Sequence, residues 1–236
     1  MSTPAPRAVI FDMDGVLLDS YNAHFQSWKQ VAADESMEVD EETFARTFGK
    51  TSRDVIRDIW NANGDEGDLT DDRLQHIDER KEQAYREIVV SEFPGMPGAV
   101  ALIDGLHAMG FALAVGTSGP AENVDLVLDQ LDRRSAFQAT VNGREVTRGK
   151  PDPEVFLTAA QKLGIPPHRC AVIEDAPLGV ESAKRAGMVA IGLISTGRTA
   201  DELREAGPHR LVQSLLHINA AEIADLIDAH SRAAEA

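Results

Sequence analysis

The stretch "VIFDMDGVLLDS", residues 9–20, places two aspartates directly after a run of apolar residues. The run is typical of a buried strand, and side chains at positions i and i+2 of a strand point the same way. Asp12 and Asp14 would therefore face each other, and their repulsion would raise the pKa of one carboxyl group unless a positive charge lay between them. A structural role explains this arrangement poorly, whereas a metal-dependent site explains it well.

Further short apolar runs recur along the chain, each bounded by Gly, Asp or Ser. The strands that we expect from all these runs are residues 8–11, 111–116, 137–141, 170–173 and 189–194. The segments between them, such as "DPEVFLTAAQKLG", have the apolar periodicity of helices. This alternation predicts an α/β fold with a doubly wound parallel sheet, a Rossmann-like core.

One interval, from about residue 20 to residue 92, contains helical patterns such as "AHFQSWKQVAA" and "TSRDVIRDIW" but no convincing strand. An all-helical insertion of this length after the first strand is typical of a separate cap domain. The segment "SEFPGMPG", rich in Pro and Gly, would return the chain to the sheet. We therefore expect an α/β catalytic core of residues 1–19 and 93–236, with an inserted helical cap of residues 20–92.

The composition is that of an acidic globular protein. A net charge of −16 over 236 residues disfavours nucleic acid and anionic membranes as partners, although a site for an anion can still be locally positive. The single cysteine, Cys170, excludes an internal disulfide framework. No apolar run approaches the roughly 18 residues of a membrane span. We expect a cytoplasmic protein that is a monomer or a homodimer.

Polar residues follow several of the expected strands, and open parallel sheets bind their ligands beyond the carboxyl ends of the strands. These residues are Asp12 and Asp14, then Thr117 and Ser118, then Glu174 and Asp175, with Lys150 in the segment "RGKPDPEVF" before a helix. Acid pairs after two strands, a hydroxyl group after another and one fixed cation suit phosphoryl transfer. The joint placement predicts an enzyme that acts on a small phosphorylated substrate.

Four segments, "DMDG", "GTS", "GKPDP" and "IEDAPLG", resemble the signature segments of the haloacid dehalogenase superfamily of phosphohydrolases, in the same order. The chain is similar over nearly its whole length to the subgroup that contains β-phosphoglucomutases and sugar phosphatases, including a helical cap. The resemblance implies that Asp12 is the nucleophile, forming an aspartyl-phosphate, and that Asp14 is the general acid and base. It also implies Mg²⁺ as the cofactor, held by Asp12, the backbone carbonyl of Asp14 and Asp175. Glu174 is either a direct ligand or a partner of the ligands, and both readings stay open.

The resemblance also assigns the residues that contact the phosphoryl group. Thr117 would donate its hydroxyl group to a phosphoryl oxygen, with backbone N–H groups of the Ser118 and Gly119 segment at the next helix. Lys150 would neutralise charge on the transferring group and on the nucleophile. Taken alone, Thr117 could instead be a helix N-cap and Lys150 a solvated surface lysine.

Three cap residues match positions of β-phosphoglucomutases that bind substrate or control the acid–base step: His24 in "AHFQSWK", Arg53 in "TSRDVI" and Lys81 in "RKEQAY". His24 and Trp28 lie four residues apart on one helix face, so they could instead be a packing pair. Arg53 and Lys81 lie in polar helical stretches, for which a solvated face is the usual explanation.

Two segments separate the possible activities within the subgroup. "FGKTSR" resembles the phosphatase branch, and "TSGPAEN" lacks the serine and lysine run that is typical of the mutases. We therefore expect a Mg²⁺-dependent phosphatase that hydrolyses a small phosphorylated metabolite, a sugar phosphate above all. The alternatives are a sugar phosphomutase and, in another class, a non-catalytic binding or regulatory module on the same fold.

Overall fold

The computed structural model describes residues 5–47, 50–64 and 69–235, so residues 48 and 49 of the "FGKTSR" segment lie outside it. The chain forms two compact units, one of residues Ser20–Pro94 and one of the remaining residues. The helical unit ends at Pro94, and the next residue, Gly95, forms a β-bridge with Leu18 within the larger unit.

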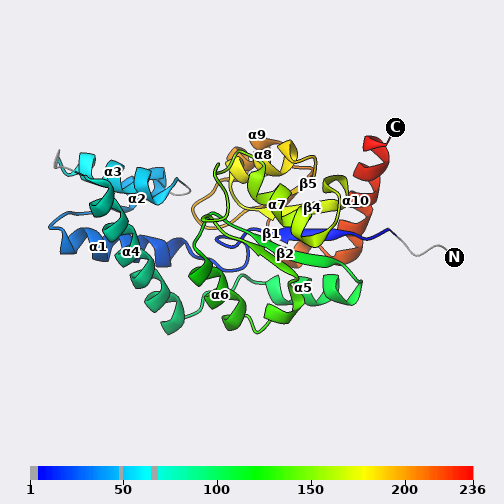
Figure 1. Ribbon diagram of the computed structural model, residues 1–236, viewed down its shortest axis with the longest axis horizontal. Helices are drawn as coiled ribbons and strands as arrows, with labels where there is room; N and C mark the ends of the chain where they lie inside the picture. The colour runs from blue at the N-terminus through cyan, green and yellow to red at the C-terminus, as the bar shows by residue number, and fades with distance from the viewer. Residues whose placement is uncertain (1–4, 48–49, 65–68, 236) are drawn as a thin grey trace. The chain divides into compact units, whose positions relative to one another are not determined.

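The larger unit is built on a parallel sheet (Figure 1). Its strands are β1 (Ala8–Phe11), β2 (Ala112–Gly116), β3 (Ala139–Val141), β4 (Cys170–Glu174), β5 (Val189–Leu193) and β6 (Arg210–Val212). Their order in the sheet is β3-β2-β1-β4-β5-β6, and every neighbouring pair is parallel. This order confirms the doubly wound, Rossmann-like fold.

The last strand, β6, is absent from the strands expected from the sequence. It has only three residues, begins with the exposed Arg210 and has one buried residue, Val212, so it forms no apolar run. The other five strands lie where the apolar runs predict them, β1 with the predicted bounds and the others with one end that differs by one or two residues. β1 and the central strands are fully buried, which is why their sequences are almost wholly apolar.

Helices cover both faces of this sheet. They are α5 (Ala99–Ala108), α6 (Ala121–Gln130), α7 (Glu154–Leu163), α8 (Pro177–Arg185), α9 (Ala200–Ala206) and α10 (Ala220–Ala234), with 3₁₀ turns at Arg134–Ala136, Pro167–Arg169 and Leu215–His217. Phe156 of α7, Val180 of α8 and Leu203 of α9 share one buried cluster with Ile10 and Val172 of the strands. Figure 1 shows α5 and α6 on the opposite side of the sheet from α7 and α8.

The helical unit consists of α1 (Tyr21–Asp34), α2 (Glu41–Thr47), α3 (Ser52–Ala62) and α4 (Asp71–Ser91). α1 packs against α4, and α3 contacts both α2 and α4, around a separate apolar cluster that includes Trp28, Ile56 and Trp60. The side chains of Thr51 and Thr70 cap α3 and α4 by accepting hydrogen bonds from backbone N–H groups. Among the helices described in either unit, none is long and apolar enough to cross a bilayer.

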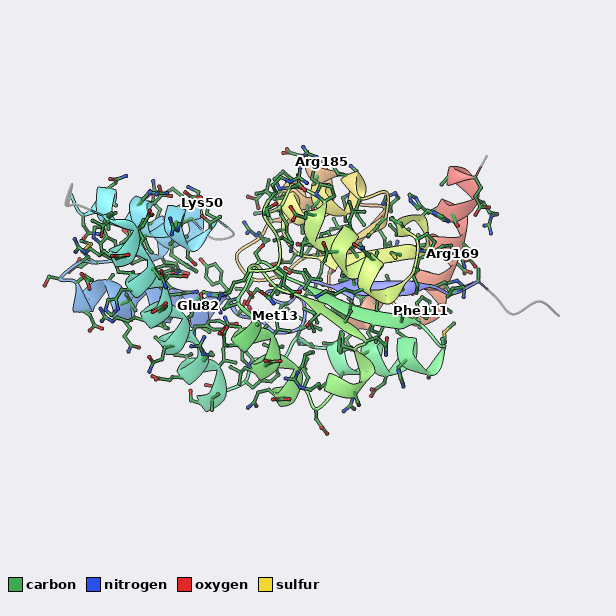
Figure 2. The ribbon with its side chains drawn as sticks, in the orientation of Figure 1. Met13, Lys50, Glu82, Phe111, Arg169 and Arg185 are labelled. Carbon is green, nitrogen blue, oxygen red and sulfur yellow. The ribbon has the colours of Figure 1, made fainter. Side chains whose placement is uncertain are left out.

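Several of the predicted site residues lie at the carboxyl end of the sheet. Figure 2 labels Phe111 and Arg169 at the amino ends of their strands, and Met13 at the opposite end, just beyond β1. The strand order reverses between β1 and β4, and the carboxyl ends of these two strands carry Asp12, Glu174 and Asp175. Parallel sheets of this kind bind their ligands at such a reversal point.

Candidate functional site

Asp12 is the first residue beyond β1, and the neighbouring strand fixes its backbone. Its N–H group donates to the carbonyl oxygen of Ile173 at 3.0 Å, and Asp12 is 7% exposed. β1 ends at Phe11, so Asp12 and Asp14 lie beyond the strand and its regular alternation does not extend to them. Asp14 belongs to the turn that follows, and its negative charge still helps to raise the pKa of Asp12.

Lys150 lies between two of the predicted carboxylates. Its Nζ atom is 2.9 Å from Oδ1 of Asp12 and 2.5 Å from Oε1 of Glu174, and it also lies 5.0 Å from the centre of the Phe156 ring. The Lys150 side chain is 10% exposed, so the surface-lysine alternative is wrong. Burial lowers the pKa of Lys150, but the charges of Asp12 and Glu174 outweigh burial and raise it above the ordinary value. Lys150 is therefore a fixed positive charge.

Glu174 is completely buried, and both of its carboxylate oxygens have partners. Oε1 faces Lys150, while Oε2 accepts a hydrogen bond of 2.8 Å from the N–H group of Ala176, just before α8. A Cβ atom added to Gly179 would lie 1.8 Å from Oε1 of Glu174. The missing side chain at Gly179 thus makes room for this carboxylate beneath the first turn of α8.

Asp175 follows the end of β4 and is 4% exposed. Its Oδ2 atom accepts a hydrogen bond of 2.6 Å from the hydroxyl group of Ser195, which lies just beyond β5. Gly15 adjoins the same oxygen, and its φ of +73° and missing side chain leave space for the carboxylate. Burial, with the charge of Glu174, raises the pKa of Asp175 to about 7, although the Ser195 hydrogen bond and the charge of Arg198 act in the opposite direction.

The residues of this acidic cluster, Asp12, Glu174 and Asp175, fit a divalent cation. They can each offer an oxygen, and these oxygens all lie within 4.8 Å of one another. Their carboxylates outnumber the Lys150 ammonium group, and burial raises the pKa of Asp12 well above its usual range, with a further contribution from the other two carboxylates. A hard cation such as Mg²⁺ takes oxygen ligands and would relieve this repulsion. Sequence and structure thus agree on a place where a metal could bind.

Thr117 lies directly beyond β2 and is 2% exposed. Its hydroxyl oxygen accepts a hydrogen bond of 3.1 Å from the N–H group of Gly119, whereas the N-cap of α6 is Pro120, so the N-cap alternative for Thr117 is wrong. A Cβ atom added to Gly119 would lie 3.5 Å from Oγ1 of Thr117 and 3.8 Å from Oδ2 of Asp14. Thr117, Gly119 and Asp14 are thus neighbours, while Ser118 is exposed.

In the helical unit, His24 and Lys81 form a cluster of their own. Nζ of Lys81 lies 2.8 Å from Nδ1 of His24 and 2.7 Å from Oε1 of Glu82, and it is 5.3 Å from the ring centres of both Trp28 and Tyr85. The His24 ring stacks on Tyr85 with a centre-to-centre distance of 4.2 Å. The Lys81 side chain is only 4% exposed, so the solvated-face explanation is wrong for this residue.

Arg53 has the exposed setting that its polar surroundings in the sequence favour. It lies in the first turn of α3, its side chain is 53% exposed, and it forms an ion pair of 2.7 Å with Asp71 at the start of α4. Both partners are largely exposed, so this pair contributes little to stability.

Ser195 is a site residue that the sequence reasoning did not select. It lies at the carboxyl end of the sheet, where the same rule that pointed to Asp12 and Thr117 applies, but no motif marks the segment "LISTGR". The signal that could have found it is a hydroxyl residue directly after the apolar run of residues 189–194.

Comparison with known proteins places this geometry in a wider group. A family model described as haloacid dehalogenase-like hydrolase matches residues 6–187. A β-phosphoglucomutase of Bacillus subtilis is 33% identical over 189 residues, a match that covers 79% of this chain and 83% of that protein. A phosphorylated carbohydrates phosphatase of Thermotoga maritima is 32% identical over 208 residues, covering 88% of this chain and 94% of that protein.

Among solved structures, a β-phosphoglucomutase from Clostridium difficile superposes with a TM-score of 0.83. The superposition covers 96% of this chain and 99% of that one, at 21% sequence identity. At this identity the likeness concerns the fold, including the combination of a parallel sheet with a helical insertion.

Proposed function

Since the chain belongs to the haloacid dehalogenase-like hydrolases, we propose that it is a Mg²⁺-dependent phosphatase that hydrolyses a small phosphorylated metabolite, a sugar phosphate above all. The observation that carries the proposal is the buried cluster in which Lys150 lies 2.9 Å from Asp12, with Asp175 beside them. A nucleophilic carboxylate, a fixed cation and a metal-binding carboxylate are the groups that phosphoryl transfer through an aspartyl-phosphate requires.

In the first step, an Asp12 oxygen attacks phosphorus and the bond from phosphorus to the substrate oxygen breaks. Asp14 protonates the departing alcohol. In the second step, Asp14 accepts a proton from the water molecule that attacks the aspartyl-phosphate, which releases inorganic phosphate and restores Asp12. Asp14 suits both steps because it lies in the turn directly after Asp12, next to Gly119 and Thr117.

The remaining site residues hold and neutralise the phosphoryl group. Thr117 donates its hydroxyl hydrogen to a phosphoryl oxygen, and the backbone N–H groups of Ser118 and Gly119 bind the same group. Lys150 offsets the negative charge of the nucleophile and of the transferring oxygens. Mg²⁺, when bound, neutralises further charge on the phosphoryl oxygens.

Asp12, the backbone carbonyl of Asp14 and Asp175 would hold the metal ion. We assign Glu174 a supporting role, because one of its oxygens faces Lys150 and the other accepts a hydrogen bond from Ala176. That arrangement fixes the Lys150 ammonium group. It leaves the carboxylate oxygens of Asp12 and Asp175 to bind the metal ion.

A second candidate function is a sugar phosphomutase, in which the aspartyl-phosphate returns its phosphoryl group to another hydroxyl group of the sugar. The 33% identity to the β-phosphoglucomutase of Bacillus subtilis favours it. Two observations favour hydrolysis instead. The chain is 32% identical to the Thermotoga maritima phosphatase over 94% of that protein. The segments "FGKTSR" and "TSGPAEN" differ from the pattern that is typical of the mutases.

The experiment that tests the proposal measures phosphate release from a panel of sugar phosphates and short-chain phosphates in the presence of Mg²⁺. The panel includes β-glucose 1-phosphate, and a parallel assay follows glucose 6-phosphate formation with a bisphosphate primer. Each reaction is repeated with EDTA, and then with Mg²⁺ restored in excess. The Asp12→Asn variant, purified in the same way, measures any contaminating phosphatase.

Prompt phosphate release without isomerisation, lost with EDTA and restored by Mg²⁺, is the expected result. Isomerisation with little phosphate release would replace the phosphatase by the mutase. The absence of both activities on every substrate would contradict both enzymes and leave the non-catalytic binding module.

A further inference from the structure

The hydroxyl group of Ser195 makes a contact that none of the steps above uses. Its Oγ atom donates a hydrogen bond of 2.6 Å to Oδ2 of Asp175, a carboxylate that is 4% exposed. A carboxylate beyond the end of its strand is free to turn about its side-chain bonds unless a neighbour holds it. Ser195 is such a neighbour, and it comes from a different strand, β5.

The backbone around Ser195 is itself well fixed. The N–H group of the preceding residue, Ile194, donates to the carbonyl oxygen of Val212 in β6 at 2.9 Å. The carbonyl oxygen of Ser195 accepts from the N–H group of Arg198 at 3.3 Å, which closes a turn around Gly197 with its φ of +79°. The serine hydroxyl group is therefore presented to Asp175 from an ordered position.

The backbone of Gly15 lies against the same oxygen of Asp175. A Cβ atom added to Gly15 would lie 2.0 Å from Oδ2 of Asp175 and 3.1 Å from Oγ of Ser195. The Oδ2 atom of Asp175 is thus close both to the backbone of the turn after β1 and to the serine hydroxyl group. Both neighbours restrict the rotation of the carboxylate.

We propose that Ser195 is a positioning residue, which holds the Asp175 carboxylate in the orientation that the divalent cation requires. The inference rests on the proposed metal site, and Ser195 itself contacts neither the substrate nor the reacting atoms. Groups that hydrogen-bond to a metal ligand fix its orientation, and their loss commonly weakens metal binding by about 10- to 100-fold.

The next residue, Thr196, supplies a matched control. Its hydroxyl group donates a hydrogen bond of 2.6 Å to Oδ2 of Asp19 and not to Asp175, although it belongs to the same turn. Loss of this second hydroxyl group removes an equally short hydrogen bond from the same segment. It leaves the contact between Ser195 and Asp175 in place.

The test is isothermal titration calorimetry of the 236-residue chain with Mg²⁺ alone, without substrate. We expect Ser195→Ala to weaken Mg²⁺ binding by about 10-fold or more, and Thr196→Val to stay within about 2-fold of wild type. Ser195→Thr and Ser195→Val introduce side chains of the same shape, of which only threonine has a hydroxyl group. Comparing these two variants isolates the effect of the hydroxyl group, even where the alanine variant folds poorly. The threonine variant should retain the affinity and the valine variant should lose it.

Equal Mg²⁺ affinity in Ser195→Val and Ser195→Thr, with the wild type binding normally, would overturn the inference and leave the proposed function intact. Equal losses in Thr196→Val and Ser195→Val would also overturn it, because the effect would then belong to the turn as a whole. A wild-type protein that binds no Mg²⁺ would instead contradict the proposed metal site.

Discussion

Lys150 and Lys81 are both enclosed, with side-chain exposures of 10% and 4%, but their surroundings differ in kind. Lys150 lies at the strand ends of the larger unit, where carboxylates outnumber it. Lys81 lies on a helix of the other unit, where its partners are an imidazole nitrogen, one carboxylate and two aromatic rings. One lysine is therefore part of a site with excess negative charge, whereas the other has surroundings that balance its charge.

The difference separates two ways in which a protein can bury an ammonium group. A cluster that keeps unbalanced negative charge costs stability until a cation joins it, so its natural role is to bind one. A lysine between aromatic rings, with a hydrogen-bond acceptor and one acid, is stabilised by the protein alone. We expect changes at the first lysine to act on catalysis and changes at the second to act first on stability.

The largest effect that we expect follows the loss of the nucleophile. Asp12→Asn keeps the shape of the side chain but removes the attacking oxygen anion, so kcat should fall by about 10³-fold or more. Steady-state phosphate release measures this, with Asp104→Asn as a control because Asp104 is a half-exposed partner of Arg133 in the same unit. A kcat for Asp12→Asn within 10-fold of wild type would contradict the nucleophile assignment.

Loss of the Lys150 ammonium group should have the second largest effect on kcat. Lys150→Met keeps most of the volume but leaves Asp12 and Glu174 without their positive partner, and kcat should fall by about 10²- to 10³-fold. Lys162, which pairs with Glu145 on the surface of the same unit, provides the control Lys162→Met. Similar activities in the two variants would show that Lys150 is no different from a surface lysine.

Lys81→Met tests whether the second buried lysine acts on stability rather than on catalysis. The variant loses contacts with His24, Trp28 and Tyr85, so the free energy of unfolding should fall by about 1–2 kcal/mol, while kcat/KM changes by less than about 10-fold. Urea unfolding and steady-state kinetics measure the two quantities. Lys29→Met is the control, because Lys29 lies over the Phe25 ring at 5.4 Å but is exposed. A larger loss of kcat/KM at unchanged stability would make Lys81 a substrate contact.

The smallest effect should come from Arg53, an exposed cation of the helical unit. Arg53→Ala should raise KM by about 5- to 10-fold for substrates with a second, distal anionic group, and leave other substrates unchanged. Its loss from the surface should alter the free energy of unfolding by less than about 1 kcal/mol. Arg57→Ala, on the same helix and similarly exposed, is the matched control. Equal KM values for Arg53→Ala and Arg57→Ala would identify Arg53 as an ordinary surface charge.

The sheet and much of the site could be predicted because a buried strand requires a recognisable pattern of residues in the sequence. A buried parallel strand needs an unbroken apolar run, and the residue after it lies at the ligand-binding edge. Asp12, Thr117 and Asp175 each follow such a run. Strand β6 escaped prediction because it is short and partly exposed.

The remaining features depend on contacts that exist only in the folded structure. Whether Glu174 binds a metal or supports Lys150 depends on where β4 ends and on the space left by Gly179. The burial of Lys81 depends on aromatic rings from α1 and α4 that meet only when the helices pack. Local periodicity contains no information on either contact.

The two glycines beside the carboxylates bear on any attempt to change the substrate range by directed evolution. Even an alanine at position 15 or 179 would place its Cβ atom within about 2 Å of Asp175 or Glu174, at 2.0 Å and 1.8 Å respectively. Randomised libraries that include these positions would consist largely of clones that lose activity whatever the substrate. The helical unit has an apolar cluster that is separate from that of the larger unit, so it tolerates substitutions better. Libraries confined to exposed positions of α3 and α4 can therefore be screened without disturbing the acidic cluster.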